Sequence, residues 1–560
     1  MHVVATAGHV DHGKSTLVQR LTGMWPDRLA EEQRRGLTID LGFAWTTIDG
    51  RTIAFVDVPG HERFVGNMLA GVGPVAAVMF VVAADEGWMP QSEEHFEALQ
   101  ALGVAHTLVV ITKADVADPQ DAVAQVRERF PDAPVVVATD IERVRAELVA
   151  LVDGLPVPDR DADVRLWVDR SFTVRGAGTV VTGTLAAGTI RVGDELECGG
   201  RRVTVRALQS LGQDRAEVAA VARVAVNVRG ADRRDIARGD ALRTPDAWLD
   251  TSEVDVALRA KDLLPRQVTL HIGAAAVPVQ VRPLGAAAAR LRLSRPLPLR
   301  IGDAGVLRDP GGQRTAVGFE VLDVRPAPLR RRGDARLRAA ELATGRVTPP
   351  VCARADELRA IGFRVEGRRI GEWVVDPRWW AQQRAAAVDA VDRWAADHDI
   401  AAGMPLEALR QTLTLPAIEL VAPALDGSGL QVVDGRVRRP GAGLPERVEK
   451  ALRVLEERWS GGPFSAPDAD ALVEMELGTR ELAAAVRAGR LTRIADGVVL
   501  GPDAIERAAA VLQTLAQPFT VAEAKRALGT TRRVAVPLLE LLDKQRLTRR
   551  ASDGTRTINT

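Results

Sequence analysis

The chain has 560 residues, more than one hydrophobic core usually supports, so at about 150 residues per domain we expect three or four domains. Lys and Arg together number 74, as do Asp and Glu, which excludes a global attraction to nucleic acid and leaves only local basic patches. The longest apolar run, Val75–Ala84, is too short to cross a bilayer. Cys198 and Cys352 match no metal or redox spacing. We therefore expect a cytoplasmic protein rather than a membrane protein or a disulfide scaffold.

Apolar, β-rich segments alternate with helix-like segments over residues 1–160. The five strand-like segments are Val3–Ala7, Ile53–Val58, Val75–Val82, Thr107–Ile111 and Pro134–Ala138. Such alternation predicts a parallel sheet covered by helices. The first domain is therefore predicted to be an α/β domain.

A glycine-rich phosphate-binding signature lies between the first of these strands and a predicted helix. Its residues are Gly8, His9, Val10, Asp11, His12, Gly13, Lys14, Ser15 and Thr16. Glycines let backbone amides approach phosphate oxygens, and the following helix N-terminus adds positive potential. Lys14 neutralises the β- and γ-phosphates, and the Ser15 hydroxyl can ligate Mg²⁺. The segment predicts a P-loop that binds a nucleoside triphosphate with Mg²⁺.

A nucleotide switch is predicted around the end of the second strand. Asp57 can hold Mg²⁺ through water, and the Gly60 amide can sense the third phosphate. Thr38 can close over the metal only when that phosphate is present, so the metal set is Ser15, Thr38 and Asp57. His61, directly after the glycine, is the candidate for orienting the attacking water. A surface histidine without that role is the alternative.

The tetrapeptide Thr112-Lys113-Ala114-Asp115 follows another predicted strand. The carboxylate of Asp115 can accept hydrogen bonds from guanine N1–H and N2–H₂, a donor pair that adenine lacks. The sequence therefore favours GTP over ATP and predicts a GTPase.

Two further β-rich stretches follow, over residues 164–248 and 252–327. The first is marked by glycine turns at Gly176, Gly178, Gly183 and Gly188, a spacing typical of a small barrel. A second such run ends near Arg325. We expect two small β-barrels.

Residues 333–560 are richer in helix-like segments and contain an apparent repeat of helices followed by a short hairpin. The proposed turns are Glu366-Gly367, Asp434-Gly435, Asp496-Gly497 and Asp553-Gly554. Glycine accepts positive φ without a steric penalty, so these pairs suit two-residue hairpin turns. About four repeats are predicted, forming a tandem array.

The last repeat, residues 503–560, has the clearest pattern. Thr520 and Glu523 form a capping box that opens a helix, and Gly529 can end it. A second helix is predicted over 532–544, followed by a hairpin around Asp553-Gly554. Helix, turn, helix and hairpin together predict a winged helix.

This last repeat is locally basic. It carries ten Lys or Arg against six Asp or Glu, a net of +4 (10 − 6) in a chain of net zero. The candidate RNA-binding residues are Arg532, Arg533, Arg549, Arg550 and Arg556. They can meet a phosphate backbone, with a solvated charged face as the alternative.

The P-loop together with Asp57-Val58-Pro59-Gly60-His61 resembles the translational GTPases of the elongation factor Tu class. Phe172–Leu185 resembles the second domain of that class, and the stretch to about Val324 resembles its third. A further 236 residues follow Val324 (560 − 324). This extension, with Glu31–Ala44, resembles the selenocysteine-specific elongation factors of bacteria, and the resemblance covers nearly the whole chain.

The resemblance implies GTP-dependent delivery of selenocysteinyl-tRNA to a ribosome paused at a UGA codon, followed by hydrolysis to GDP and phosphate. It also implies that the last winged helix binds an mRNA hairpin, and that the protein works as a monomer without a membrane partner. A positively charged pocket for the selenolate is implied, with the candidates Asp169, Arg170, Arg223 and Arg234. Thr112 stands where the class commonly has Asn, and Ala138 is the one matching residue of the last guanine loop.

Two alternatives stay open from the sequence. A general aminoacyl-tRNA elongation or initiation factor with an unrelated tail would bind many aminoacyl-tRNAs without discrimination. A GTP-regulated DNA-binding protein would use its winged helices on duplex DNA, since a helix-turn-helix more often enters a DNA major groove.

Overall fold

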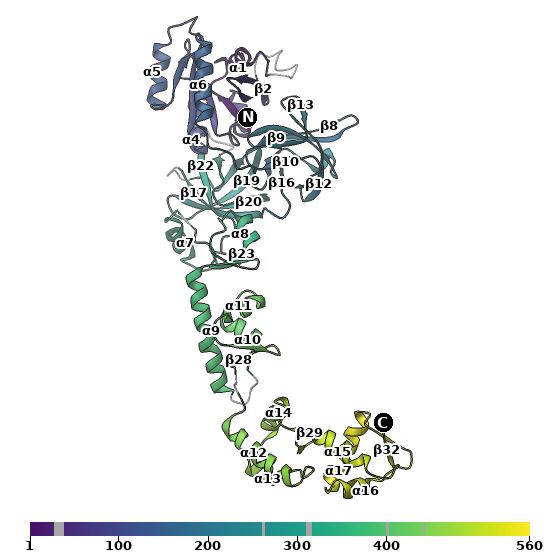
Figure 1. Cartoon of the computed structure of the whole chain (residues 1–560). Coiled ribbons are helices and arrows are strands. Elements are labelled where there is room, and N and C mark those ends of the chain that lie inside the picture. Colours follow the sequence, from purple (N-terminus) through teal and green to yellow (C-terminus); the bar gives the residue numbers. More distant parts are fainter. Residues whose placement is uncertain are drawn as a thin grey trace. The chain divides into compact units, whose positions relative to one another are not determined.

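The computed structural model describes residues 1–26, 38–259, 264–309, 316–345, 347–398, 403–440 and 443–559. The chain divides into two compact units, Met1–Glu366 and Gly367–Thr560 (Figure 1). Each unit has hydrophobic clusters of its own. Residues 31–37 of the Glu31–Ala44 segment lie outside the described residues.

The N-terminal domain contains a six-stranded sheet of order β2-β3-β1-β4-β5-β6. The strands are β1 (His2–Ala7), β2 (Gly42–Ile48), β3 (Arg51–Asp57), β4 (Ala77–Ala83), β5 (His106–Thr112) and β6 (Val135–Val137). Neighbours pair in parallel except β2, which runs antiparallel to β3. The five predicted strands are present, so the α/β prediction is confirmed. The unpredicted strand β2 joins β3 through Asp49-Gly50, whose φ angles of 46° and 76° suit a two-residue hairpin turn.

Helices cover both faces of this sheet. They are α1 (Lys14–Thr22), the short 3₁₀ helix η1 (Glu62–Phe64), α3 (Val65–Val72), α4 (Pro90–Leu102), α5 (Gln120–Arg129) and α6 (Ile141–Asp153). Successive side chains of a strand point to opposite faces. Accordingly, Phe80 of β4 packs in the cluster that holds α3, α4 and α5, whereas Val81 packs in the one that holds α1 and α6. Burial on both faces explains why β4 is apolar throughout.

A β domain follows, built on an eight-stranded sheet. Its elements are β7 (Arg165–Trp167), β8 (Arg170–Val174), β9 (Gly178–Leu185), β10 (Thr189–Arg191), β11 (Glu195–Cys198), β12 (Arg201–Ser210), β13 (Gln213–Arg215), β14 (Glu217–Ala219), β15 (Ala222–Arg229), η2 (Arg233–Asp235) and β16 (Ala241–Arg243). The order is β7-β16-β11-β12-β15-β9-β8, with β13 beside β12, while β10 pairs separately with β14. Alternate residues of β15, such as Val224 and Val226, form part of its core.

The next six strands form a closed barrel of order β17-β20-β19-β18-β21-β22. Its strands, and the elements that complete the first unit, are β17 (Asp250–Leu258), β18 (Gln267–Ile272), β19 (Ala275–Pro283), β20 (Ala288–Pro298), β21 (Ala304–Arg308), β22 (Val317–Asp323), α7 (Asp334–Leu342), β23 (Cys352–Arg354) and α8 (Ala355–Ile361). Closure leaves the sheet without exposed edges.

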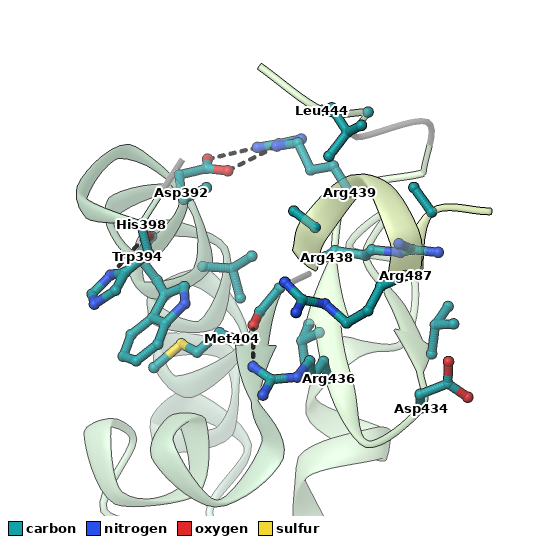
Figure 2. Close-up of a pocket in the computed structure, with 18 residues that line it drawn as sticks. Asp392, Trp394, His398, Met404, Asp434, Arg436, Arg438, Arg439, Leu444 and Arg487 are labelled. Atoms are coloured by element: carbon teal, nitrogen blue, oxygen red, sulfur yellow. Dashed lines mark hydrogen bonds and ion pairs between the residues drawn. The ribbon is translucent and has the colours of Figure 1, made fainter. Parts of the chain in front are cut away.

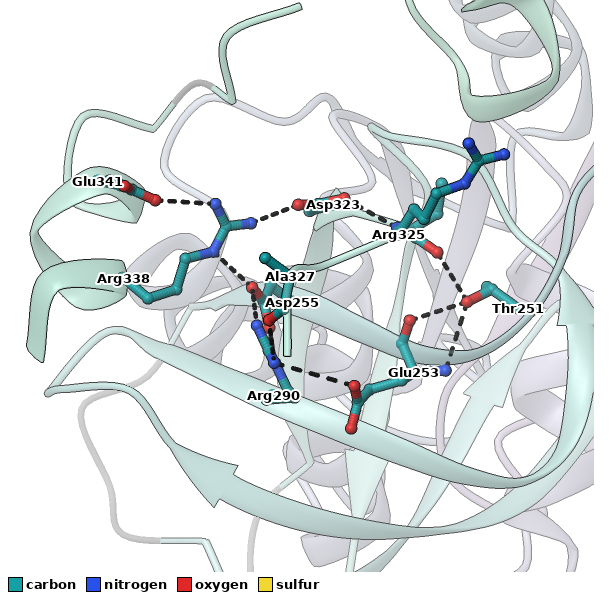
Figure 3. Close-up of polar contacts among 10 residues, drawn as sticks. Thr251, Glu253, Asp255, Arg290, Asp323, Arg325, Ala327, Arg338 and Glu341 are labelled. Atoms are coloured by element: carbon teal, nitrogen blue, oxygen red, sulfur yellow. Dashed lines mark hydrogen bonds and ion pairs between the residues drawn. The ribbon is translucent and has the colours of Figure 1, made fainter. Parts of the chain in front are cut away.

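A buried ion network attaches α7 to this barrel (Figure 3). The Asp255 side chain is fully buried and accepts from Arg290 Nε at 2.7 Å and from Arg338 Nε at 2.7 Å. Arg338, on α7, also binds Asp323 and Glu341. A buried carboxylate requires such pairing because its desolvation is otherwise costly. The network therefore fixes the helix that follows the barrel.

The second unit repeats helices followed by short hairpins. Its elements are β24 (Arg368–Ile370), β25 (Trp373–Val375), α9 (Pro377–Asp397), β26 (Met404–Pro405), α10 (Leu406–Thr412), η3 (Ile418–Leu420), α11 (Val421–Leu425), β27 (Gln431–Val433), β28 (Arg436–Arg438), α12 (Glu446–Gly461), α13 (Ala469–Glu474), α14 (Thr479–Arg487), β29 (Thr492–Ala495), β30 (Val498–Leu500), α15 (Ala504–Gln513), α16 (Val521–Ala527), α17 (Arg532–Lys544), β31 (Thr548–Arg550) and β32 (Arg556–Ile558).

Three of the four predicted hairpins lie where expected, between β27 and β28, β29 and β30, and β31 and β32. The last connection is longer than the two-residue turn expected, since residues 551–555 separate β31 from β32. The prediction at Glu366-Gly367 is wrong. There Ile370 pairs with Trp373, so the chain turns at Gly371 and Glu372 instead. Gly371 also has positive φ, at 59°, and can serve the turn in the same way.

The last repeat folds as the sequence predicts. The Thr520 backbone amide donates to Glu523 Oε2 at 2.7 Å, and the Glu523 amide donates back to Thr520 Oγ1, which completes the capping box. The second helix, α17, has the predicted bounds, and its apolar face packs against α15 and α16. The winged-helix prediction is confirmed.

The fold class is confirmed as a whole: an α/β domain, β domains that include a closed barrel, and a helical C-terminal array with a winged helix. Within the described part of the chain, no helix is both long enough and apolar enough to span a membrane.

Candidate nucleotide site and basic surfaces

The P-loop connects the end of β1 to the start of α1, and its backbone requires glycine at two places. Gly8 has φ 127°, and a Cβ added there would lie 2.1 Å from the Val81 carbonyl oxygen. Gly13 has φ 80° and directly precedes the first residue of α1. The loop therefore packs closely against β4 at Gly8 and leads directly into the N-terminus of α1 at Gly13. This arrangement suits phosphate binding.

Lys14 lies folded against the P-loop itself. Its Nζ donates to the carbonyl oxygens of Gly8 at 3.0 Å and His9 at 2.6 Å. A Cβ added to Gly60 would lie 2.5 Å from the same Nζ. The segment after β3 therefore touches the P-loop lysine, which brings the two predicted phosphate-sensing elements together.

Three oxygen-bearing side chains converge beside Lys14. Ser15 Oγ donates to Asp57 Oδ2 at 2.6 Å and lies 3.1 Å from Thr38 Oγ1. Thr6 Oγ1 donates to the other Asp57 oxygen at 2.6 Å, which fixes the carboxylate. Hydroxyl and carboxylate oxygens are the donors that Mg²⁺ prefers. The predicted metal set therefore forms one cluster whose chemistry fits Mg²⁺.

His61 lies at the start of η1, next to Gly60. Its Nδ1 accepts from the Arg63 backbone amide at 3.2 Å, and its ring centroid lies 6.0 Å from that of Phe64. The imidazole is half-buried, and the bond to Nδ1 leaves Nε2 available.

The predicted base-binding residues lie at the end of β5 and directly after β5 and β6. Thr112 Oγ1 donates to the His12 carbonyl at 2.6 Å, so its hydroxyl supports the P-loop. Lys113 has φ 50° and pairs with Asp85 at 3.1 Å, while the Asp115 side chain is exposed. The Ala138 amide donates to the Ile111 carbonyl at 2.7 Å, which fixes its loop beside β5.

Residues that sequence reasoning did not select support the P-loop from α4. The Gly8 amide donates to His95 Nδ1 at 3.0 Å, and the Val10 amide donates to Gln91 Oε1 at 3.4 Å. Burial lowers the pKa of His95 to about 3, so this imidazole is neutral and can accept. Burial likewise lowers the pKa of His12 to about 3. No sequence signal connects His95 to Gly8, since 87 residues separate them.

Three of the four predicted pocket residues line one cavity of about 570 Å³ on the first β domain: Asp169, Arg170 and Arg234. Arg223 instead forms a bidentate pair with Asp169, and its guanidinium lies 3.9 Å from the centroid of the Phe43 ring. Arg170 Nε donates to Asp40 Oδ2 at 2.9 Å. The cavity is thus joined to the segment that follows Thr38.

The five predicted RNA-binding arginines divide into two groups. Arg532, Arg533, Arg549 and Arg550 are exposed, although Arg533 donates to the Pro467 carbonyl. Arg556 is only 3% exposed and donates from Nε to Asp543 at 2.9 Å. Its guanidinium stabilises the winged helix internally and does not share the surface of the others.

Two family models match the chain. The model described as "Elongation factor Tu GTP binding domain" matches residues 1–233, and "Elongation factor SelB, winged helix" matches residues 510–557. The second range contains most of the last helix-turn-helix and its hairpin.

Curated relatives and solved structures match over much longer stretches. The selenocysteine-specific elongation factor of Escherichia coli strain K12 is 32% identical over 98% of this chain and 97% of its own length. That of Desulfomicrobium baculatum is 36% identical over 59% of this chain and 57% of its own. The crystal structure of a bacterial selenocysteine-specific elongation factor, EF-Sec, aligns with a TM-score of 0.71 at 25% identity and covers 100% of both chains. This chain is a translational GTPase, and it belongs to the family of selenocysteine-specific elongation factors.

Proposed function

We propose that the chain carries selenocysteinyl-tRNA to UGA codons on the ribosome in a GTP-dependent manner. Relatives named as selenocysteine-specific match it over nearly its full length. Within this chain, the proposal rests on the basic cavity at β8, because Arg170 at its edge also binds Asp40, two residues after Thr38. A nucleotide-dependent change at Thr38 can therefore reach the cargo cavity through one ion pair.

The proposed GTP lies on the loop of residues 8–13, with Lys14 turning from its own carbonyl partners to the phosphates. Ser15, Thr38 and Asp57 would hold Mg²⁺, a role that their convergence supports. The bound ion would neutralise charge on the β- and γ-phosphates. Asp115, exposed after β5, is free to meet the guanine edge.

The cargo cavity suits an ionised selenolate. Arg234 lines it and, among the described residues, has no ion-pair or hydrogen-bond partner in the protein. The Asp169–Arg223 pair behind it is largely buried and holds the wall of the cavity in place. A guanidinium without a carboxylate partner attracts an anionic selenolate more strongly than it attracts a neutral hydroxyl. Selenocysteine should therefore be preferred over serine on the same tRNA.

His61 is proposed to orient the attacking water when the ribosome triggers hydrolysis. Its position beside Gly60, with Nε2 available, supports this role. His61→Ala should lower ribosome-stimulated GTP hydrolysis by at least about 100-fold and leave GTP affinity unchanged. Loss of GTP affinity with unchanged single-turnover hydrolysis would contradict the assignment.

The last winged helix is proposed to bind the mRNA hairpin through its exposed arginines Arg532, Arg549 and Arg550. Their exposure on α17 and β31 supports contact with phosphates. A factor that acts on the ribosome in this way works in the cytoplasm, and we propose that it does so as a monomer.

The deciding experiment compares affinity for selenocysteinyl-tRNA, seryl-tRNA on the same tRNA, and a standard elongator aminoacyl-tRNA. Each is measured with a non-hydrolysable GTP analogue and with GDP. We expect tight binding of selenocysteinyl-tRNA with the GTP analogue alone. Arg234→Ala should reduce the preference over seryl-tRNA, whereas Arg202→Ala, which removes an exposed arginine outside the cavity, should not.

Other outcomes identify the alternatives. Equal affinity for all aminoacyl-tRNAs would indicate a general elongation or initiation factor. Absence of tRNA binding, together with tight and selective binding of duplex DNA, would indicate a GTP-regulated DNA-binding protein.

A further inference from the structure

The second unit contains a cavity of about 730 Å³ between the C-terminal end of α9, the hairpin β27–β28 and α14 (Figure 2). The side chains that matter are Trp394, His398, Arg436, Arg438, Arg439 and Arg487. Its volume falls in the range of small-ligand sites, which is about 300–1,000 Å³. None of these residues belongs to the last winged helix, so the cavity is separate from the proposed hairpin-binding surface.

The cavity is basic. Four arginines line it against two carboxylates, Asp392 and Asp434, a net of +2 (4 − 2). Arg439 uses both carboxylate oxygens of Asp392, at 2.8 and 2.6 Å, so that pair is internally neutral. The guanidiniums of Arg438 and Arg487 have no hydrogen-bond or ion-pair partner among the described residues, and both side chains line the cavity. Two guanidiniums from different elements are therefore available to an anion.

An aromatic pair forms another wall. The rings of Trp394 and His398 are stacked, with centroids 4.0 Å apart and an angle of 9° between planes. His398 is exposed, and both rings line the cavity. Trp394 Nε1 is buried and has no hydrogen-bond partner among the described residues. A buried donor without a partner is costly, and a ligand that accepts from it would relieve that cost.

Guanidiniums without partners and aromatic rings that line the same cavity match the chemistry of a single-stranded nucleotide, whose phosphate and base need these two kinds of contact. Arg436 also lines the cavity. Its Nη1 donates to the Gly403 carbonyl at 3.1 Å, which fixes the side chain in place. We propose that this cavity binds an unpaired RNA segment, with phosphates at Arg438 and Arg487 and a base stacked on His398. It is a second RNA site, and it does not depend on the hairpin contact proposed for the last winged helix.

The test uses the full-length chain with Arg549→Ala and Arg550→Ala as background, so that the exposed arginines of β31 cannot account for binding. The probe is a fluorescein-labelled ten-nucleotide oligo(U), measured by fluorescence anisotropy at several salt concentrations. Adding Arg438→Ala and Arg487→Ala should weaken binding at least about tenfold at low salt. Loss of two phosphate contacts should also lower the slope of log affinity against log salt by about 1.4.

The matched control adds Arg453→Ala and Arg480→Ala instead. These arginines are exposed on α12 and α14, lie outside the cavity and give the same charge change, so binding should be nearly unaffected. His398→Ala tests the stacking contact on an exposed side chain and should weaken binding about fivefold or more. Equal losses in the control and cavity variants would overturn the proposal, as would unchanged binding in the cavity variant. A ten-residue oligoglutamate that binds as tightly as oligo(U) would also overturn it, in favour of an acidic peptide.

Discussion

Arg170 donates from Nε to Asp40 Oδ2 at 2.9 Å, so a residue at the edge of the basic cavity binds the segment that follows Thr38. Arg170 also donates to the Leu41 carbonyl, and Arg238 lies 3.7 Å from the same aspartate. The first β domain therefore contacts the predicted switch through side chains that also border the cavity. Occupancy of the cavity and the conformation of the switch should then influence each other.

The first prediction concerns the energy of this contact. A double-mutant cycle with Arg170→Ala, Asp40→Asn and the double variant should give a coupling of about 0.5–1 kcal/mol, because the pair is only partly shielded from solvent. The free energy of unfolding, from denaturation followed by intrinsic fluorescence, supplies the four values. The same cycle between Asp40 and Arg202, which pairs with Asp246 instead, should give a coupling near zero. Zero coupling for Arg170 would show that the pair does not stabilise the fold and would contradict the prediction.

Thr112 gives the second prediction. Its hydroxyl donates to the His12 carbonyl and so shapes the P-loop rather than the guanine pocket alone. Thr112→Ala should weaken GTP and GDP equally, by about tenfold, because loss of one buried hydrogen bond costs about 1–1.5 kcal/mol and does not involve the third phosphate. Fluorescent nucleotide titration measures both affinities. Thr107→Ala, on the same strand, is the control, and a loss confined to GTP would contradict the explanation.

Contacts within a continuous motif were predictable because local spacing determines them. The P-loop, the last capping box and the bounds of α17 all depend on residues close in sequence. The dipeptide Asp49-Gly50 favours a hairpin turn and so could have indicated strand β2. It was missed because the alternation of strands and helices predicts only parallel neighbours, whereas β2 is antiparallel to β3. The turn at Gly371 was missed because Glu366-Gly367 offers a similar dipeptide four residues earlier.

Contacts between distant segments could not be predicted in this way. His95 supports Gly8 from 87 residues away, and Arg170 binds Asp40 across 130 residues. The five candidate RNA-binding arginines of the last repeat are chemically alike in the sequence. Only the packing of α17 against the hairpin distinguishes buried Arg556 from exposed Arg549, because Asp543 lies beside one of them. Partner choice by a charged side chain is a tertiary property, and local spacing does not encode it.

The third prediction concerns the network around Asp255. Asp255→Asn should destabilise the protein by about 3–5 kcal/mol, because it leaves the guanidiniums of Arg290 and Arg338 buried against a neutral amide. Chemical denaturation measures the loss, and limited proteolysis should cut more readily around α7. Adding Arg338→Met should recover part of the stability, since it removes one of the two guanidiniums that have lost Asp255 as a partner. Asp153→Asn removes only an exposed pair with Arg51 and should leave the denaturation midpoint unchanged.

The fourth prediction is a pH dependence that arises from His95. Burial lowers its pKa to about 3 in the folded protein, whereas an unfolded histidine titrates near 6.5. The unfolded chain therefore binds a proton that the folded chain rejects, so the stabilisation is complete above about pH 6.5 and is lost progressively as the pH falls toward 3. As the pH falls from 6 to 4, the opening free energy of the first domain should fall more steeply than in His95→Asn. The difference between the two slopes should be about 1.4 kcal/mol per pH unit. Hydrogen exchange of peptides from β1 and α4, corrected for intrinsic rates, measures this difference. His398→Asn should keep the steep dependence, and parallel slopes for the chain and His95→Asn would contradict the lowered pKa of His95.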